Sequence, residues 1–391
     1  MIICFLRESS YLNYLIELIL ILVFTIIFGK LFQRLGLPGV VGQLISGVFL
    51  GPSILNIVHT GSIISTFSDI GVIILMFIAG LESNLDLLKK YLNPSLLVAI
   101  LGILAPILFM YIAGIMHRFS NVESLFIGII FAATSVSISV EVLREMKELD
   151  SVEGITILGA AVADDVLSIL ALSFAVSFFG VSDDNNANII ITILLQIGFF
   201  ILVYVLYKVI TKWLNLFIKK FNLGITEIAM ITCLALSYLA EETSLSTITG
   251  AFFAGIIFSR TDFKKDISNK FENIGYSLFI PVFFANVGLN MELSGIVNNL
   301  LVFVIFTVLA VITKFFGAML GAKISKFNSI SSMEIGAGMI SRGEVGLIIA
   351  GIGLNAHLIS EGYYSTIIAS IVATTLIAPI ILRKIILIKK R

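Results

Sequence analysis

The chain has 391 residues, of which 58% are hydrophobic and only 13% are charged, and its mean hydropathy is +1.09. A soluble domain carries about 25% charged residues, so this composition excludes a soluble globular protein and indicates an integral membrane protein. The formal net charge is zero and there is no basic or acidic tail, so we expect no nucleic-acid partner.

Apolar segments long enough to cross a bilayer recur along the chain, which favours a helical bundle over an outer-membrane barrel with its short alternating strands. We expect an all-α membrane protein with about thirteen transmembrane helices, at residues 12–35, 39–55, 65–82, 93–116, 122–146, 152–179, 188–211, 225–241, 245–259, 271–291, 296–323, 330–354 and 361–387. The segments 39–55 and 245–259 are short for a full span. No soluble domain fits between the helices.

Most of the 25 Lys and Arg residues fall in alternate loops, and the opposite loops hold only Arg7 and Arg118. By the positive-inside rule, the C-terminus is expected to be cytoplasmic and the N-terminus external. Two basic residues, Lys314 and Arg342, belong to neither set of loops because they fall inside expected spans.

Asp164 and Asp165 are adjacent in the otherwise apolar segment 152–179. They lie about twelve residues into the helix, or roughly 18 Å along it, which is near the middle of a bilayer. A charge at that depth costs at least about 2.5–3.5 kcal/mol, so it must be paired, protonated or bound to an ion. Helical spacing places Lys314, Arg342 and Glu344 at a similar depth, so all five groups could share one layer.

This layer would hold three carboxylates and two basic groups. If each base satisfies one carboxylate, one acid remains and must hold either a proton or a cation. Competition between the two at one site would couple their movements. Adjacent side chains on a helix point about 100° apart, so one aspartate can pair with Lys314 while its neighbour faces a water-filled cavity. The alternative is a set of buried structural salt bridges.

Two expected helices are interrupted near their middles by small and hydroxyl-bearing residues. Segment 122–146 contains AATSVSIS at 132–139, and segment 330–354 contains GAGMISRGEVG at 336–346. If 188–211 is a linker helix, residues 12–179 and 225–387 form two inverted repeats, and these interruptions correspond. Matched interruptions in inverted repeats indicate a transport site, although small residues also favour close helix packing.

Several motifs occur in the order typical of a known family. They are LGLPGVVGQLISGVFLGPS at 35–53, GVIILMFIAGLE at 71–82, ATS at 133–135, the Asp164-Asp165 pair, PVFF at 281–284, Lys314, and SRGEVG at 341–346. With these motifs the chain resembles the bacterial monovalent cation:proton antiporters of the second branch, the NapA-like and Kef-like proteins.

This resemblance implies an NhaA-like inverted-repeat fold with two broken, crossing helices, a mobile core domain, a dimerisation domain and an elevator movement. It implies that Asp165 is the principal cation and proton carboxylate and that Asp164 pairs with Lys314. Thr134 and Ser135 would lie at the crossing of the broken helices, with Ser341, Arg342 and Glu344 as accessory residues. A double-aspartate site with a lysine resembles the electrogenic members.

The expected protein is therefore a secondary-active Na⁺(Li⁺)/H⁺ antiporter, multi-pass in the inner or plasma membrane, and not an enzyme. We expect one membrane transport domain over residues 1–391, a homodimer in lipid, no cofactor, and no fixed metal beyond the transported Na⁺ at Asp165. Kef-like relatives append a nucleotide-binding domain after the position where this chain ends, which favours Na⁺.

A K⁺/H⁺ antiporter of the same fold remains the alternative, because the sequence does not define cavity size. An intramembrane aspartyl protease is disfavoured, since its two aspartates must face each other from separate helices. A passive channel needs a continuous pore rather than a single site with one surplus acid.

Overall fold

The computed structural model describes residues 13–83, 85–178, 186–221, 224–291, 297, 299–355 and 358–390. Within these ranges the regular structure is entirely helical, which confirms the expected all-α class. Each of the expected segments contains helix. Seven helices of the described ranges are long and apolar enough to cross a membrane, so the total of thirteen spans stays a prediction.

One group of helices, which we call the scaffold bundle, forms one side of the molecule. Close approaches at glycines hold it together: a Cβ at Gly47 would lie 1.9 Å from Ala285 O, and one at Gly80 would lie 2.0 Å from Phe252 O. Only glycine allows backbones to pack this closely. The bundle consists of α2 (Asn13–Arg34), α3 (Gly39–Leu50), α4 (Ser62–Glu82), α11 (Ile225–Glu242), α12 (Thr247–Phe258), α13 (Lys264–Ile274), the π-helical turn η1 (Gly275–Phe279) and α14 (Ile280–Leu289).

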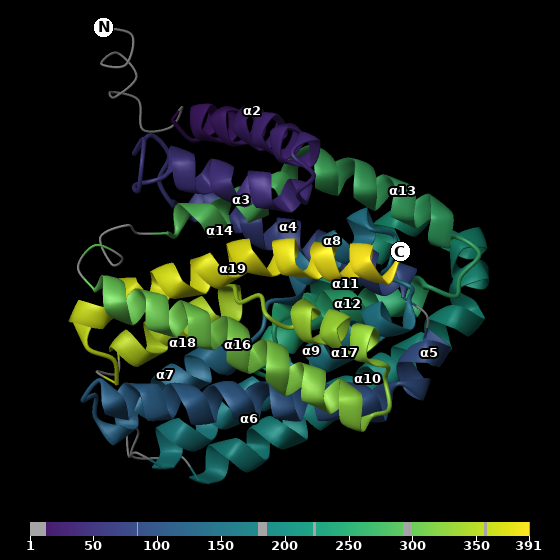
Figure 1. Ribbon diagram of the computed structural model, residues 1–391. Coiled ribbons are helices and arrows are strands. Elements are labelled where there is room, and N and C mark those ends of the chain that lie inside the picture. The colour runs from purple at the N-terminus through teal and green to yellow at the C-terminus, as the bar shows by residue number, and fades with distance from the viewer. Residues whose placement is uncertain are drawn as a thin grey trace, which may run out of the picture.

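A second group, the site bundle, packs around α6, α16 and α19. It consists of α6 (Leu92–Met116), α7 (Asn121–Ala132), α8 (Val136–Glu145), α9 (Val152–Phe178), α16 (Leu300–Ile324), α17 (Ser329–Gly338), α18 (Glu344–Asn355) and α19 (Glu361–Lys389). In Figure 1, α2 and α3 lie at one edge of the molecule, α6 lies near the opposite edge, and α19 runs between them. The long helix α10 (Asn186–Phe221) contacts both bundles through α12 and α9, and the short α5 (Leu85–Lys90) packs against α9 and α6.

Both expected interruptions are present as breaks between half-helices. Residues 133–135 separate α7 from α8, and residues 339–343 separate α17 from α18. Capping side chains set where the leading half-helices begin, since Ser120 Oγ accepts from Glu123 N at 3.1 Å and Asn328 Oδ1 accepts from Ser331 N at 2.8 Å.

The two breaks meet inside the site bundle. Ser135 N donates to Ser341 O at 2.9 Å, and Ser139 Oγ donates to Gly338 O at 2.6 Å. A break leaves helix-terminal N–H and C=O groups without partners, and within a membrane these must be satisfied by the protein. Each break therefore provides hydrogen-bond partners for some of the backbone groups that the other break leaves unpaired.

Two elements differ from expectation. α10 continues to Phe221, and α13 occupies residues expected to be mostly loop. The physical reason is visible in α13, where Ile267 and Phe271 lie one turn apart and are both fully buried. That spacing gives a charged helix one apolar stripe to pack.

Candidate functional site

Asp164 and Lys314 form an ion pair in the interior of the site bundle. Lys314 Nζ lies 2.8 Å from Asp164 Oδ1, and the two side chains are 0% and 1% exposed, respectively. Asp164 Oδ2 also accepts a hydrogen bond from the backbone N–H of Thr134 at 2.9 Å. The carboxylate is therefore held by a lysine of α16 and by a backbone donor of the first break.

Positive charges also meet the carbonyl end of the half-helix α7. Lys314 Nζ donates to Ala132 O at 2.5 Å, and Arg342 Nε donates to Phe131 O at 2.8 Å. The last carbonyls of a helix lack partners within it and carry the negative end of its dipole. The two cations thus compensate the buried end of α7, and Asp164 lies at the positive, N-terminal end of α8.

Arg342 is satisfied by backbone oxygens. Besides Phe131 O, its Nη1 donates to Ile340 O at 2.6 Å and its Nη2 donates to Ala310 O at 2.8 Å. Among the side chains that the structure describes, no salt bridge joins Arg342 to a carboxylate. These three acceptors are all carbonyl oxygens, so the pairing of Arg342 with a carboxylate stays a prediction. α18 begins at Glu344, but the placement of that side chain lies outside the described part.

Asp165 faces a different environment from its neighbour. Its Oδ2 accepts a hydrogen bond from Thr249 Oγ1 of the scaffold bundle at 2.6 Å. The residue is half-buried and lines a cavity of about 730 Å³ between the two bundles. The adjacent aspartates thus divide as helix geometry allows, one facing a lysine and the other facing a cavity.

The cavity runs from Asp165 to exposed polar residues. Two carboxylates on its wall, Asp69 near the start of α4 and Glu241 near the end of α11, are exposed, and Asn286 and Asn290 of α14 add amides. Val345 and other residues of α18 form the wall on the site-bundle side. A small hydrophilic solute therefore has a polar route to Asp165 from this end of the molecule.

The hydroxyl residues at the breaks differ in what they contact. Ser341 Oγ donates to Ser135 O at 2.5 Å and so helps to hold the breaks together. The Ser135 hydroxyl lies 3.0 Å from that of Ser137. Thr134 Oγ1 is buried and has no hydrogen-bond partner among the described residues, and it belongs to the residue whose backbone N–H bonds Asp164.

Sequence reasoning missed Thr249. A single threonine in the short apolar segment 247–258 has the pattern of an ordinary packing residue. The available signal was its position near the start of a helix too short to span a bilayer, in the half of the chain opposite Asp165. Nothing in the sequence alone places these two segments side by side.

The chain belongs to the sodium/hydrogen exchanger family: the model of the transmembrane sodium/hydrogen exchanger domain matches residues 19–388. The family consists of transporters rather than enzymes. A Na⁺/H⁺ antiporter of Enterococcus hirae is 46% identical over 94% of this chain and 96% of its own length. The Na⁺/H⁺-K⁺ antiporter GerN of Bacillus cereus is 39% identical over 95% of this chain and 96% of its own.

The fold is also similar to that of a solved structure. The sodium proton antiporter MjNhaP1 from Methanocaldococcus jannaschii superposes with a TM-score of 0.67, covering 95% of each chain at 20% sequence identity. This similarity confirms the antiporter fold that the resemblance implied.

Proposed function

We propose that this chain is a secondary-active Na⁺(Li⁺)/H⁺ antiporter in which Asp165 is the carboxylate that alternates between cation and proton. The observation that carries the proposal is the division of the aspartate pair: Asp164 is held by Lys314 and Thr134 N, whereas Asp165 lines the cavity. The 46% identity to an Enterococcus hirae Na⁺/H⁺ antiporter supports the same assignment.

Exchange is possible because the Asp165 carboxylate can bind either a cation or a proton. A cation that reaches Asp165 through the cavity favours the ionised carboxylate and expels its proton, and protonation expels the cation. The unpartnered Thr134 hydroxyl would supply a neutral oxygen to a hard monovalent cation. Because proton and cation compete, lowering the pH should weaken apparent Na⁺ affinity.

The Lys and Arg content of the loops beside the cavity indicates which side of the membrane the cavity faces. The cavity opens where α4 begins and α11 ends, and the adjoining loops are those poor in Lys and Arg. With the C-terminus cytoplasmic and the N-terminus external in the plasma membrane, the cavity is outward-open. An elevator movement of the site bundle against the scaffold bundle would then carry Asp165 to the other side. We also propose that residues 12–179 and 225–387 form inverted repeats and that residues 188–211 form the linker helix between them. The protein is proposed to be a homodimer in lipid.

K⁺/H⁺ exchange is the second candidate. The observation that favours it is the 39% identity to GerN, which is described as a Na⁺/H⁺-K⁺ antiporter. The carboxylate chemistry serves either ion, and selectivity depends on the size and hydration of the site.

Proteoliposomes with an imposed pH gradient test the function. Na⁺, Li⁺, K⁺ or choline is added separately while a fluorescent dye reports the gradient. We expect Na⁺ and Li⁺ to collapse the gradient and choline to leave it intact. Collapse by K⁺ alone would select the second candidate, and no cation-dependent proton movement would overturn both.

A further inference from the structure

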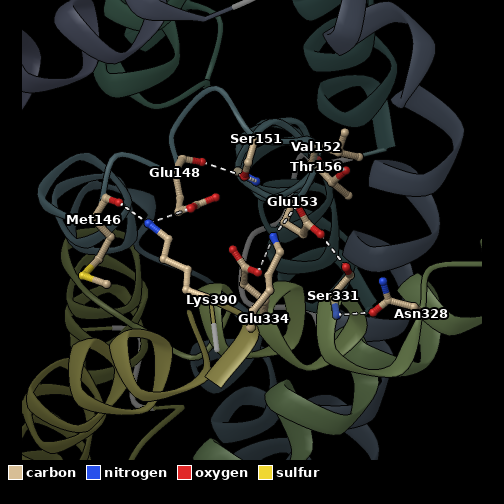
Figure 2. Close-up of polar contacts among 12 residues, drawn as sticks. Met146, Glu148, Ser151, Val152, Glu153, Thr156, Asn328, Ser331, Glu334 and Lys390 are labelled. Carbon is tan, nitrogen blue, oxygen red and sulfur yellow. Dashed lines mark hydrogen bonds and ion pairs between the residues drawn. The ribbon is translucent and has the colours of Figure 1, made fainter. Parts of the chain in front are cut away.

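A second cluster of buried charges lies at the end of the site bundle away from the cavity (Figure 2). Lys389, at the end of α19, places its Nζ 2.8 Å from Glu153 Oε2 and 2.9 Å from Glu334 Oε2. Glu153 belongs to the first turn of α9 and Glu334 to the half-helix α17. One ammonium group therefore joins three helices.

The two carboxylates are almost completely withdrawn from solvent. Glu334 is 0% exposed and Glu153 is 7% exposed. Glu153 Oε1 accepts from the Ser331 hydroxyl, whereas Glu334 Oε1 is buried without a hydrogen-bond partner among the described residues. A carboxylate oxygen left in this way is costly unless a cation or proton serves it.

The surrounding charges do not remove the imbalance. The neighbouring Lys390 lies 2.8 Å from Glu148 Oε1 and donates to Met146 O at 2.8 Å (Figure 2). Among the described residues the cluster has the three carboxylates of Glu148, Glu153 and Glu334 against the two ammonium groups of Lys389 and Lys390. One negative charge is in excess.

The oxygen atoms around the Lys389 ammonium are ligands of the kind that bind a monovalent cation. Two carboxylate oxygens from different helices converge on one point, and a third, Glu334 Oε1, belongs to the same pair of carboxylates. An ammonium group and K⁺ are of similar size and prefer oxygen partners. The Lys389 side chain is 28% exposed, so its head group can leave toward solvent, as a long flexible lysine allows.

We propose that Glu153 and Glu334 form a second monovalent-cation site, in which the Lys389 ammonium is a tethered occupant that a free alkali-metal ion replaces. The site is separate from Asp165: Glu153 precedes Asp164 by three turns of α9. Replacing Lys389 by a free ion releases α19 from α9, which carries both aspartates, and from α17, which leads into the second break. Cation occupancy at this end thereby changes how firmly α9 and α17 are held to α19 within the site bundle.

The first test measures thermal stability of the purified full chain in detergent, with every variant also carrying Asp165→Asn so that the transport carboxylate is absent. Lys389→Gln should give a saturable rise in Tm of a few degrees with KCl or NaCl over choline chloride. Lys389→Arg, which keeps a tethered cation in the site, should show a smaller rise that needs more salt, and adding Glu334→Gln to Lys389→Gln should remove the rise. The proposal is overturned if the Tm of Lys389→Gln is the same in KCl or NaCl as in choline chloride. It is also overturned if the rise in Tm persists after Glu334→Gln is added.

The second test needs no change at Lys389. In the Asp165→Asn chain, acylation of Lys389 by an amine reagent is followed by peptide mass spectrometry, with the exposed Lys323 as internal reference. Saturating K⁺ should increase Lys389 labelling severalfold relative to choline, because the displaced ammonium enters solvent. Equal labelling in the two salts contradicts the proposal. A cation-dependent Tm in Asp165→Asn with Lys389 intact and its labelling unchanged would instead count against Asp165 as the transport site.

Discussion

Asp164 and Asp165 show how two identical neighbours acquire different chemistry from their surroundings. Asp164 is enclosed by Lys314 and the N–H of Thr134, so it behaves as part of the framework of the breaks. Asp165, one position further round α9, reaches the Thr249 hydroxyl and the cavity. The difference arises from direction alone, since consecutive helical side chains diverge by about 100°.

Replacing Lys314 by alanine should destabilise the protein. Asp164 is 1% exposed, and removing one partner of a buried ion pair leaves an uncompensated charge at a cost of about 3–5 kcal/mol. We expect a clear fall in the thermal unfolding midpoint, with partial recovery when Asp164→Asn is added. Lys323→Ala on the same helix, at an exposed position, should leave the midpoint unchanged. An unchanged midpoint in Lys314→Ala would show that the ion pair does not hold the break.

The residues of the site could be predicted to different degrees. Asp164, Asp165 and Lys314 stand out because charges are expensive in an apolar span, and their depths follow from helical rise. The hydrogen-bond partners of Arg342 could not be predicted, since they are carbonyls of the two breaks and of α16 that meet only in three dimensions. Thr249 was missed for the same reason, because it belongs to the other bundle.

At the scale of elements, the site depends on two helices that stop inside the protein. Their broken ends expose carbonyls to Lys314 and Arg342 and an N–H to Asp164. The hydrogen bonds of Ser135 and Ser341 keep the breaks in contact. The interruptions are visible in the sequence as small and hydroxyl residues, whereas their crossing is implied by the family resemblance and not by the residue pattern.

Gly343→Ala should push the two breaks apart. A Cβ at Gly343 would lie 2.6 Å from Ser135 Oγ and 2.7 Å from Ser135 Cβ, so the first break must shift beside Asp164. We expect strongly reduced exchange in proteoliposomes from protein that still elutes as a folded species in size-exclusion chromatography.

The matched control for this change is Gly351→Ala in α18, where an added Cβ meets nothing within 4 Å. Alanine there should leave exchange intact and raise helix stability by about 0.5–1 kcal/mol. Equal activity of both variants would mean that close contact between the breaks is not required.

For the whole molecule, the two bundles touch differently at their two ends. The cavity separates them at one end, whereas at the other end Arg144 of α8 lies 3.4 Å from Glu82 and 2.9 Å from Glu272 of the scaffold bundle. Tyr276 of η1 donates to Glu141 Oε2 at 2.6 Å beside them. These polar contacts join the two bundles at the end opposite the cavity and favour the conformation observed.

Arg144→Ala should shift the molecule toward the opposite-facing conformation, because two ion pairs across the bundle interface are lost. The reporter is a cysteine in place of Ile348, which is 61% exposed and lines the cavity. Labelling of this cysteine by a membrane-impermeant thiol reagent should fall in the Arg144→Ala background. It should not change with Lys323→Ala, which alters only contacts within the site bundle. Unchanged labelling in Arg144→Ala would argue against these contacts as a closure.

The composition and periodicity were sufficient to predict the helical segments and their membrane character at this scale. They could not predict the assembly into two bundles, because that depends on which glycine faces meet, as Gly47 meets Ala285. The shape of the cavity and the ion pairs of Arg144 follow from that assembly. The cavity and these ion pairs could therefore be described only from the structure.

The exchange of a cation for a proton at Asp165 is best examined in the Asp165→Asn variant. Purified wild type, Asp165→Asn and a control with the exposed Asp262 changed to asparagine are reconstituted at equal density, and Na⁺-dependent collapse of an imposed pH gradient is recorded. We predict that Asp262→Asn exchanges as wild type does and that Asp165→Asn shows no Na⁺-dependent signal above choline. Full Na⁺/H⁺ exchange by Asp165→Asn would show that Asp165 is not the carboxylate that exchanges the cation for a proton.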